Sequence, residues 1–522
     1  MAPPSGRLRS SLAECVRRIL SSRGLSLADL SRKSGGNRLG HVPHSLYSSL
    51  RKPSFSPSLY QLHSLSTLSG YRLVDWLALF GISLDDVSRF QVLFPSLRTV
   101  ELDARAYHPA AQIPWLYDLK EPDFSTPLAP LSQWVAFGPR RRIDSVAHDA
   151  KRAFRYVKIG SHDALAFPDL LPGSIVRVSD DFSAIRRAPA GKTPGRTIFL
   201  VRHSKGITCS RLLRSESDTI VLCSRQLPYA PVELTLGIDA VALGAVEIEI
   251  RSTAIVQKPV VSAALERYRV PSPLSRVSPA RTAGEFIERA RKACGISFRE
   301  ASERTRVIAR ELGDRRYYCS PSALSDYETR KFAPRHVHKL LSICAVYFAS
   351  AADLFEASGA ALDKAGTEAM PRNLLNLSPE IRASTGETFR FLSEMERRFG
   401  QLPHFLRAAG SSMFGLQNVS LRDVFWVGDS QEAKYSCLAG IQFLIVDRRQ
   451  KRPRASLSSP IWAQPIYVLQ RRGGDYLWGF CRLENGALSL SSLAHRVKSL
   501  RLRNGVDAEV VGRVVGVIRK LV

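Results

Sequence analysis

The sequence predicts an α+β protein with several domains, in which two all-α modules alternate with two mostly-β domains. Two observations lead to this prediction. Apolar residues recur at helical spacing within residues 1–90 and again within 281–360. Short apolar runs punctuated by glycine and proline, which is the pattern of β-strands, fill residues 151–255 and 421–522. Because helices and strands follow each other in the same order twice, we expect a tandem repeat of about half the chain.

Linkers are expected between these four domains. Residues 91–150 are rich in proline and aromatic residues and show no clear periodicity. Residues 256–280 combine proline with serine and arginine, and residues 361–420 are again irregular. Such composition is typical of segments that connect folded domains.

Composition and charge indicate the kind of partner. At 522 residues the chain has room for about three to five domains. Lysine and arginine (75) outnumber aspartate and glutamate (47), and the resulting charge of +28 favours a polyanionic partner such as nucleic acid or an anionic membrane surface. The longest apolar runs have the length of strands, so we expect no membrane-spanning segment and no membrane partner.

Cysteine usage indicates a reducing compartment. The eight cysteines lie far apart and include no Cys-x-x-Cys pair. Most have apolar neighbours, so we expect buried free thiols rather than disulfides or zinc ligands, and neither a metal nor a cofactor. The N-terminal residues lack an apolar core of signal-peptide length. These features predict a cytoplasmic protein.

The second helical segment has strong helix-start signals. Ser297 is a good N-cap for one helix, and Ser320 followed by Pro321 is a good start for the next. Leu324 and Tyr327 then lie one turn apart on one face, so we expect both in the core. Further apolar residues at helical spacing are Val337, Leu340, Leu341, Cys344 and Tyr347.

This order of a capped helix, a turn, a short capped helix and two more amphipathic helices resembles the Cro/phage-repressor type of helix-turn-helix, the XRE family. The matching segments are Gly295–Ser302, which reads GISFREAS, and Ser320–Glu328, which reads SPSALSDYE. An insertion from Val307 to Cys319 is longer than the tight turn of that family. The resemblance implies an all-α fold that binds double-stranded DNA through its third helix.

The first helical segment repeats this plan. Gly24–Ser31 reads GLSLADLS and parallels Gly295–Ser302, 271 positions later (295 − 24). A short helix is expected to begin at Pro43, which lies 278 positions before Pro321 (321 − 43). Ser56-Pro57-Ser58 then forms a cap-plus-proline start for a fourth helix. We therefore expect a second helix-turn-helix module of the same family.

The β segments show another resemblance. Leu165–Ser174 reads LAFPDLLPGS, and the strands that follow it, with SRLL and IVLCSRQLPYAPVEL between them, are similar in order to the C-terminal domain of LexA-like proteins. In the second β segment Gly440 stands 267 positions after Gly173 (440 − 173), in the corresponding place. The resemblance implies a mostly-β domain that serves for dimerisation.

LexA-like domains cleave themselves with a serine–lysine dyad, in which a neutral, desolvated lysine removes the serine proton. Here the resemblance places Leu165 at the serine position of the first domain and Ser210 at its lysine position, while Cys481 stands at the lysine position of the second. Both domains are therefore expected to be inactive pseudo-peptidase domains, without catalytic residues, and the protein is not expected to be an enzyme. The nominal nucleophiles and bases of a self-cleaving alternative are Ser161, Ser430, Lys205 and Lys434.

In helix-turn-helix proteins the first residues of the third helix meet base edges and neighbouring cations hold phosphates. Serine suits donor or acceptor edges, Ala323 suits a thymine methyl group, and Asp326 can accept from cytosine N4. The candidate DNA-binding residues are His44, Ser45, Ser48, Arg51 and Lys52 in the first module and Ser320, Ser322, Ala323, Asp326, Arg330 and Arg335 in the second. Further phosphate candidates are Arg38, Lys331 and Lys339.

We therefore expect a sequence-specific double-stranded DNA-binding protein, a transcriptional regulator of bacterial type associated with the nucleoid. The two LexA-like domains are expected to pair within one chain, as a pseudo-dimer that reads an asymmetric operator; a homodimer on a palindromic site is the alternative. Two other interpretations stay open. One is a self-cleaving LexA-type regulator, and the other is a protein-interaction scaffold that uses the helical modules, which the long insertion favours.

Overall fold

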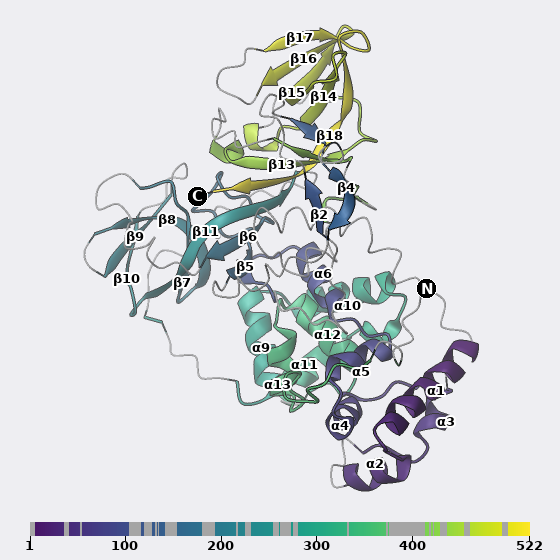
Figure 1. Ribbon diagram of the computed structural model, residues 1–522. Coiled ribbons are helices and arrows are strands. Elements are labelled where there is room, and N and C mark those ends of the chain that lie inside the picture. Colours follow the sequence, from purple (N-terminus) through teal and green to yellow (C-terminus); the bar gives the residue numbers. More distant parts are fainter. Residues whose placement is uncertain are drawn as a thin grey trace. The chain divides into compact units, whose positions relative to one another are not determined.

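The computed structural model (Figure 1) contains both helices and a large antiparallel sheet, so the predicted α+β class is confirmed. It describes residues 6–35, 41–52, 55–103, 116–119, 128–130, 133, 135–140, 154–179, 194–215, 218–224, 231–253, 260, 273–274, 280–330, 333–371, 374, 413–416, 419–420, 422–427, 436–453, 460–492 and 499–521. All structural statements below concern these residues.

The chain divides into a helical unit and a β unit. The helical unit comprises Met1–Phe94, Leu102–Ile113 and Val277–Ser384, and the β unit comprises Pro95–Glu101, Pro114–Arg276 and Thr385–Val522. Each unit therefore draws on both halves of the chain.

Local capping signals place the helices of the first helical module. The Ser26 hydroxyl accepts a hydrogen bond from the Asp29 N–H at 3.1 Å, and the Ser58 hydroxyl accepts one from Gln61 at 3.2 Å. The short helix expected at Pro43 begins instead after a turn in which the Pro43 carbonyl accepts from the Leu46 N–H. The helices described are α1 (Gly6–Ser22), α2 (Leu27–Ser34), α3 (Leu46–Leu50), α4 (Leu59–Ser69), α5 (Leu73–Leu79) and α6 (Asp85–Leu93).

The second helical module follows the same order. Its elements are α9 (Ala283–Cys294), α10 (Phe298–Glu311), the 3-10 turn η4 (Arg315–Tyr317), α11 (Pro321–Thr329), α12 (Val337–Val346) and α13 (Ala351–Ala357). The chain leaves α4 at Gly70 and α12 near Phe348 with left-handed φ values of 75° and 51°. These two residues are 278 positions apart (348 − 70), the same distance as the two prolines of the short helices. The left-handed turn is thus retained even where the residue is not glycine.

Each helical module is followed by a segment that packs on the other module. The Gln91 side chain, on α6, donates to the carbonyls of Cys344 at 2.9 Å and Ala349 at 3.0 Å. In the other direction, Tyr71 and Glu368 form a parallel bridge. Tyr71 and Ala349 are again 278 positions apart (349 − 71), so the two contacts correspond and the modules exchange equivalent segments.

Sixteen of the described strands form one sheet in the β unit, and β2 (Leu116–Leu119) and β4 (Val135–Arg140) pair separately. Those from the first half are β1 (Val100–Glu101), β3 (Ala129–Pro130), β5 (Phe154–Lys158), β6 (Ile175–Ser179), β7 (Phe199–His203), β8 (Gly206–Arg214), β9 (Thr219–Cys223), β10 (Val232–Thr235) and β11 (Ala240–Ser252). Those from the second half are β12 (Val424–Trp426), β13 (Ile441–Asp447), β14 (Ile466–Arg471), β15 (Tyr476–Glu484), β16 (Ala487–Ser492), β17 (Leu500–Arg503) and β18 (Ala508–Lys520).

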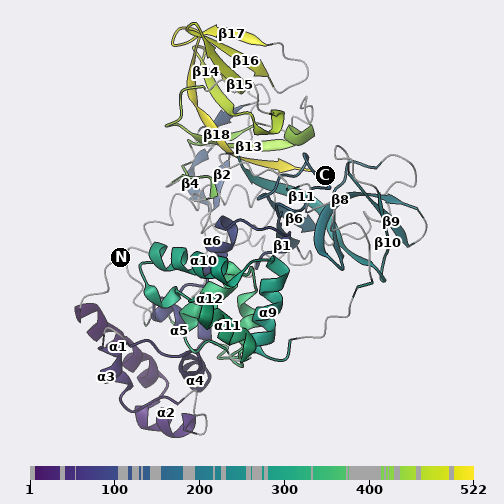
Figure 2. The same ribbon diagram turned by 180° about the vertical axis from the view of Figure 1, so that it is seen from behind.

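The same strand pairing occurs twice in this sheet. The order β10-β9-β8-β7-β11 in the first half corresponds to β17-β16-β15-β14-β18 in the second. The two sets of strands meet where β11 lies beside β18 (Figures 1 and 2). The registers also correspond: Ile250 lies opposite Ile175, and Ile518, 268 positions later (518 − 250), lies opposite Phe443, 268 positions after Ile175 (443 − 175). Each half therefore contributes strands in the same pairing order, and these two sets of strands are named the first and the second β domain below.

The two β domains meet where β11 pairs with β18 in antiparallel register. Ile250 lies directly opposite Ile518, which is its own counterpart in the other half. Pairing between corresponding residues of two strands is the local signature of a two-fold axis, as in an isologous dimer. The ladder between β11 and β18 therefore has local two-fold symmetry.

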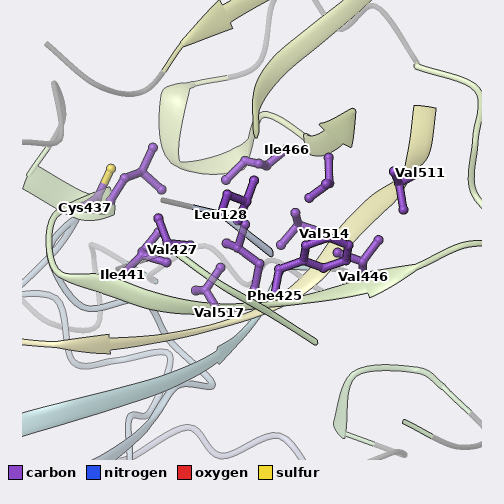
Figure 3. Packing of buried hydrophobic residues seen from close by; sticks show 13 residues of the cluster. Leu128, Phe425, Val427, Cys437, Ile441, Val446, Ile466, Val511, Val514 and Val517 are labelled. Carbon is purple, nitrogen blue, oxygen red and sulfur yellow. The ribbon is translucent and has the colours of Figure 1, made fainter. Parts of the chain in front are cut away.

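A segment from the first half completes the second β domain (Figure 3). Leu128 is only 4% exposed and packs in one core cluster with Phe425, Val446 and Val514. The strand that follows it, β3, pairs with β12. In the first β domain the corresponding edge strand, β5, pairs instead with β1, which precedes that domain directly. The second domain thus receives its outer strand from a distant part of the sequence.

Candidate nucleic-acid interface

The start of α11 exposes short polar side chains. The Ser320 hydroxyl accepts from the Ala323 N–H at 3.2 Å, and its oxygen lies 3.0 Å from the Ser322 hydroxyl. Pro321 and Ser322 are exposed, whereas Ser320, Ala323 and Asp326 are partly exposed. The first turn of this nine-residue helix therefore presents hydroxyl groups and a methyl group outward.

The opposite face of α11 is fixed in the module core. Leu324 is fully buried and Tyr327 is 8% exposed, so Tyr327 is a core residue, as expected. Behind them Glu328 accepts two hydrogen bonds from the Arg291 guanidinium of α9, at 2.8 and 3.0 Å. A two-bond arginine–carboxylate pair fixes orientation as well as distance. The outward face of α11 is held rigidly as a result.

The insertion before α11 is an ordered part of the module. Its first residues extend α10 to Glu311, and the remainder forms η4. Tyr317 packs edge-on against the buried His338 ring with 4.9 Å between centroids, and its carbonyl accepts from the Ser342 hydroxyl at 2.7 Å. Burial first, and then the Arg316 charge, lower the pKa of His338 to about 4. A neutral imidazole therefore supports the insertion.

Cationic side chains lie on the segments that precede and follow α11 and at its C-terminal end. Arg315, Arg316, Arg330 and Arg335 are all exposed. Asp314 accepts from the Arg316 guanidinium at 2.6–3.0 Å, and Asp326 lies 3.4 Å from Arg330. Among the described residues, no carboxylate pairs with Arg315 or Arg335. Burial first, and then the charges of Lys339, Arg316 and Arg335, lower the pKa of His336 at the start of α12.

The corresponding surface of the first module is smaller. Its third helix, α3, has five residues, and its N-cap, Ser45, makes no capping hydrogen bond. The Ser48 hydroxyl donates to the Ser45 carbonyl at 2.8 Å. His44, Ser45, Ser48, Arg51 and Lys52 are all exposed. The structure therefore places the five candidates of this module together on its surface.

Four further candidates lie outside the described residues. They are the phosphate candidates Arg38 and Lys331 and the self-cleavage candidates Ser430 and Lys434. Lys339 is partly exposed on α12.

The dyad positions hold groups that pack or bond to backbone. Leu165 is 2% exposed in the core of the first β domain. The Ser210 hydroxyl is buried, donates to the Arg211 carbonyl at 2.8 Å and accepts from the Cys223 N–H at 3.1 Å. Burial raises the pKa of Cys481 to about 12, so its thiol is neutral at ordinary pH.

A buried carboxylate missed by the sequence analysis lies close to these positions. Asp163 accepts from the hydroxyls of Thr99 and Thr208, both at 2.6 Å, and from the Cys209 N–H at 2.9 Å. It ties Thr99, the residue before β1, and strand β8 to the loop after β5, which is a structural role. The only signal for it in the sequence is a carboxylate among apolar residues.

All eight cysteines are buried and free, and within the described ranges no cluster of His, Cys, Asp or Glu is arranged to hold a metal ion. None of the described helices is long and apolar enough to span a bilayer. Comparison of the chain with protein-family models, with curated proteins and with solved structures finds no match.

Proposed function

We propose that this protein is a sequence-specific double-stranded DNA-binding regulator of transcription. The observation that carries the proposal is the exposed first turn of α11, with its hydroxyl groups, in a module whose neighbouring segments carry the exposed cations Arg315, Arg316 and Arg335. DNA offers a negative backbone and, in the major groove, base edges that donate or accept hydrogen bonds. The surface around α11 matches both features.

The residues divide by task in this proposal. Ser320, Ser322 and Ala323 meet base edges, and Asp326 accepts from a cytosine amino group, which selects sequence without adding attraction to phosphates. Arg330 and Arg335 hold phosphates on either side. In the first module His44, Ser45 and Ser48 face bases, and Arg51 and Lys52 hold phosphates.

One chain would supply both DNA-contacting surfaces, one at α3 and one at α11. The helical modules exchange equivalent segments, and the β domains pair through β11 and β18, so the arrangement supports a pseudo-dimer of two XRE-like modules on two LexA-like domains. The two reading surfaces differ, and the site is therefore expected to contain two unequal half-sites. The β domains act as pairing domains without catalysis, since leucine and serine occupy the positions of the dyad in the first of them.

Selection of bound duplexes from a random-sequence DNA pool tests this function. We expect an enriched motif with two different half-sites, bound by one chain, with an affinity that falls steeply as salt increases. Substitution Ser322→Ala is expected to relax one position of the motif, by about 0.5–1.5 kcal/mol, which is the net contribution of one hydrogen bond. The matched control is Thr329→Ala, at the far end of the same helix.

Two outcomes would contradict parts of the proposal. A palindromic motif bound by two chains would replace the pseudo-dimer with a homodimer but keep DNA recognition. Absence of any motif, or a motif unchanged by Ser322→Ala, would overturn sequence-specific recognition through α11 and favour a protein partner for the helical modules.

A further inference from the structure

The pairing of β11 with β18 joins the two halves of the chain in one sheet. Five residue pairs form the ladder, with Ile250 opposite Ile518 at its centre. Beyond the ladder, the Thr253 hydroxyl donates to the Val514 carbonyl at 2.6 Å. Both strands also continue into the core of their own domain, so this edge-to-edge contact is buried.

A charged cluster lies on one face of this ladder. Glu249 is fully buried and accepts hydrogen bonds from the Arg519 guanidinium and from the Ser174 hydroxyl, the latter at 2.7 Å. The Arg251 guanidinium lies 3.9 Å from the same carboxylate and donates to the Cys437 carbonyl at 3.4 Å. One buried carboxylate therefore interacts with one buried arginine from each half of the chain.

The cluster breaks the two-fold symmetry of the ladder at a single place. Arg251 and Arg519 are counterparts, 268 positions apart (519 − 251). Glu249 has Val517 as its counterpart, at the same distance (517 − 249). Only β11 thus carries an acid at this position. Arg519 lies opposite Glu249, whereas Arg251 lies opposite Val517.

The register shows which strand pairings would leave buried charges without a partner of opposite sign. If β11 met a second β11 in this register, each Glu249 would lie opposite an Arg251 and the charges would balance. If β18 met a second β18, two Arg519 side chains would be buried opposite Val517 with no acid, and unbalanced buried charges are strongly unfavourable. The β18 edge therefore requires a partner that carries Glu249, and β11 is that partner.

Other contacts also cross between the halves within each unit. Leu128 and β3 complete the core of the second β domain, and Gln91 and Glu368 belong to the segments that the helical modules exchange. The second half therefore lacks a core side chain and an outer strand unless the first half is present.

We propose that the segments before and after the connection at residues 254–279 are obligate binding partners, and that Glu249 selects the β11 edge as the one partner of β18. The chain behaves as a heterodimer of its own halves. Its assembly surface fits the other half of the same chain and excludes pairing of two β18 edges.

The test uses the full chain with a site for a sequence-specific protease inserted within residues 261–272 and cut after folding. We expect the cut halves to stay in one particle at micromolar concentration, as measured by sedimentation and native mass spectrometry. Glu249→Gln, which leaves both arginines buried without an acid, is expected to weaken association of the cut halves by about a hundredfold.

Two variants separate selection from general destabilisation. Glu247→Gln removes the partner of Arg177 within the first β domain, on the same strand, and is expected to change association less than about threefold. The double exchange Glu249→Arg with Arg519→Glu keeps the net charge and is expected to recover most of the lost association. Separation of the wild-type halves on cutting, equal effects of Glu249→Gln and Glu247→Gln, or no recovery in the exchange variant would each overturn the proposal.

Discussion

His338 illustrates how single residues stabilise the second helical module. Its imidazole is buried against Tyr317, and it faces Asp314, Arg316 and His336. Burial and the Arg316 charge lower its pKa, while the Asp314 carboxylate acts to raise it. The folded protein therefore keeps this histidine neutral down to a pH at which an unfolded chain would already have protonated it.

This arrangement predicts a pH dependence of stability. Between the ordinary histidine pKa of 6.5 and its folded value of about 4, the unfolded chain binds a proton that the folded chain does not. The free energy of unfolding of the helical unit should therefore fall as pH decreases through this window, by up to about 1.4 kcal/mol per pH unit. Thermal unfolding followed by the helical circular dichroism signal measures it.

The variant His338→Phe should lose this part of the pH dependence, because it fills the same space without a titrating group. The substitution His41→Gln, at an exposed histidine, serves as the control and should keep the wild-type pH dependence of stability. If His338→Phe shows the wild-type dependence, another group is responsible.

At the scale of elements, the short strand β3 is held in the second β domain chiefly by its neighbour Leu128. The strand has two residues, one of them a proline that has no N–H to donate. Its attachment to β12 therefore relies on burial of Leu128 in the core shown in Figure 3.

The substitution Leu128→Ala should accordingly destabilise the second β domain by roughly 2–5 kcal/mol, since it removes buried methyl groups and leaves a cavity. Urea unfolding monitored by the fluorescence of Trp462 and Trp478, which pack against this core, reports the change. Leu483→Ala, at a residue 43% exposed, is the control and should have little effect. Equal effects of the two substitutions would show that β3 contributes nothing to this core.

The sequence predicts elements better than it predicts how they meet. Ser297 and Ser320 cap helices where expected, because capping depends on residues three positions away. The fourth helix of the first module begins at Leu59 with Ser58 as its cap, two residues later than the pair Ser56-Pro57 predicts. The matched spacings of the two halves also appear in the structure as matched strand registers. By contrast, pairing of β11 with β18 and of β3 with β12 joins residues far apart in the chain, and no local pattern encodes it.

The candidate site shows the same division. The exposure of Ser322 and the burial of Tyr327 follow from helical spacing. The ordered insertion does not, because it depends on packing of Tyr317 against His338, two residues on different elements. Glu249 was not recognised either, since a single acid in an apolar strand pattern is distinguished only by the arginine that another strand brings to it.

At the scale of the whole molecule, the proposed DNA binding should draw separate contributions from the charge of +28 and from each of the two modules. The first module has a short third helix and the neighbouring cations Arg51 and Lys52. We therefore expect these two residues to contribute affinity through phosphates rather than sequence preference.

The double substitution Arg51→Gln with Lys52→Gln should make the slope of log affinity against log salt less steep by about 1.8, or about 0.9 for each phosphate released. The preferred DNA motif should stay unchanged. Titrations at several salt concentrations measure the slope. An altered motif with an unaltered slope would assign base recognition, not phosphate contact, to this pair.

The order of synthesis has a bearing on the dependence of the second β domain on Leu128. A ribosome makes Leu128 well before Phe425, and β11 well before β18. At about 5–20 residues per second, the nascent chain waits on the order of tens of seconds with an unpaired strand edge exposed. Such an edge is a template for pairing with other chains. The protein therefore matures late, after the last strand has left the ribosome, and its yield in the cell should depend on chaperones that shield β11 during this interval.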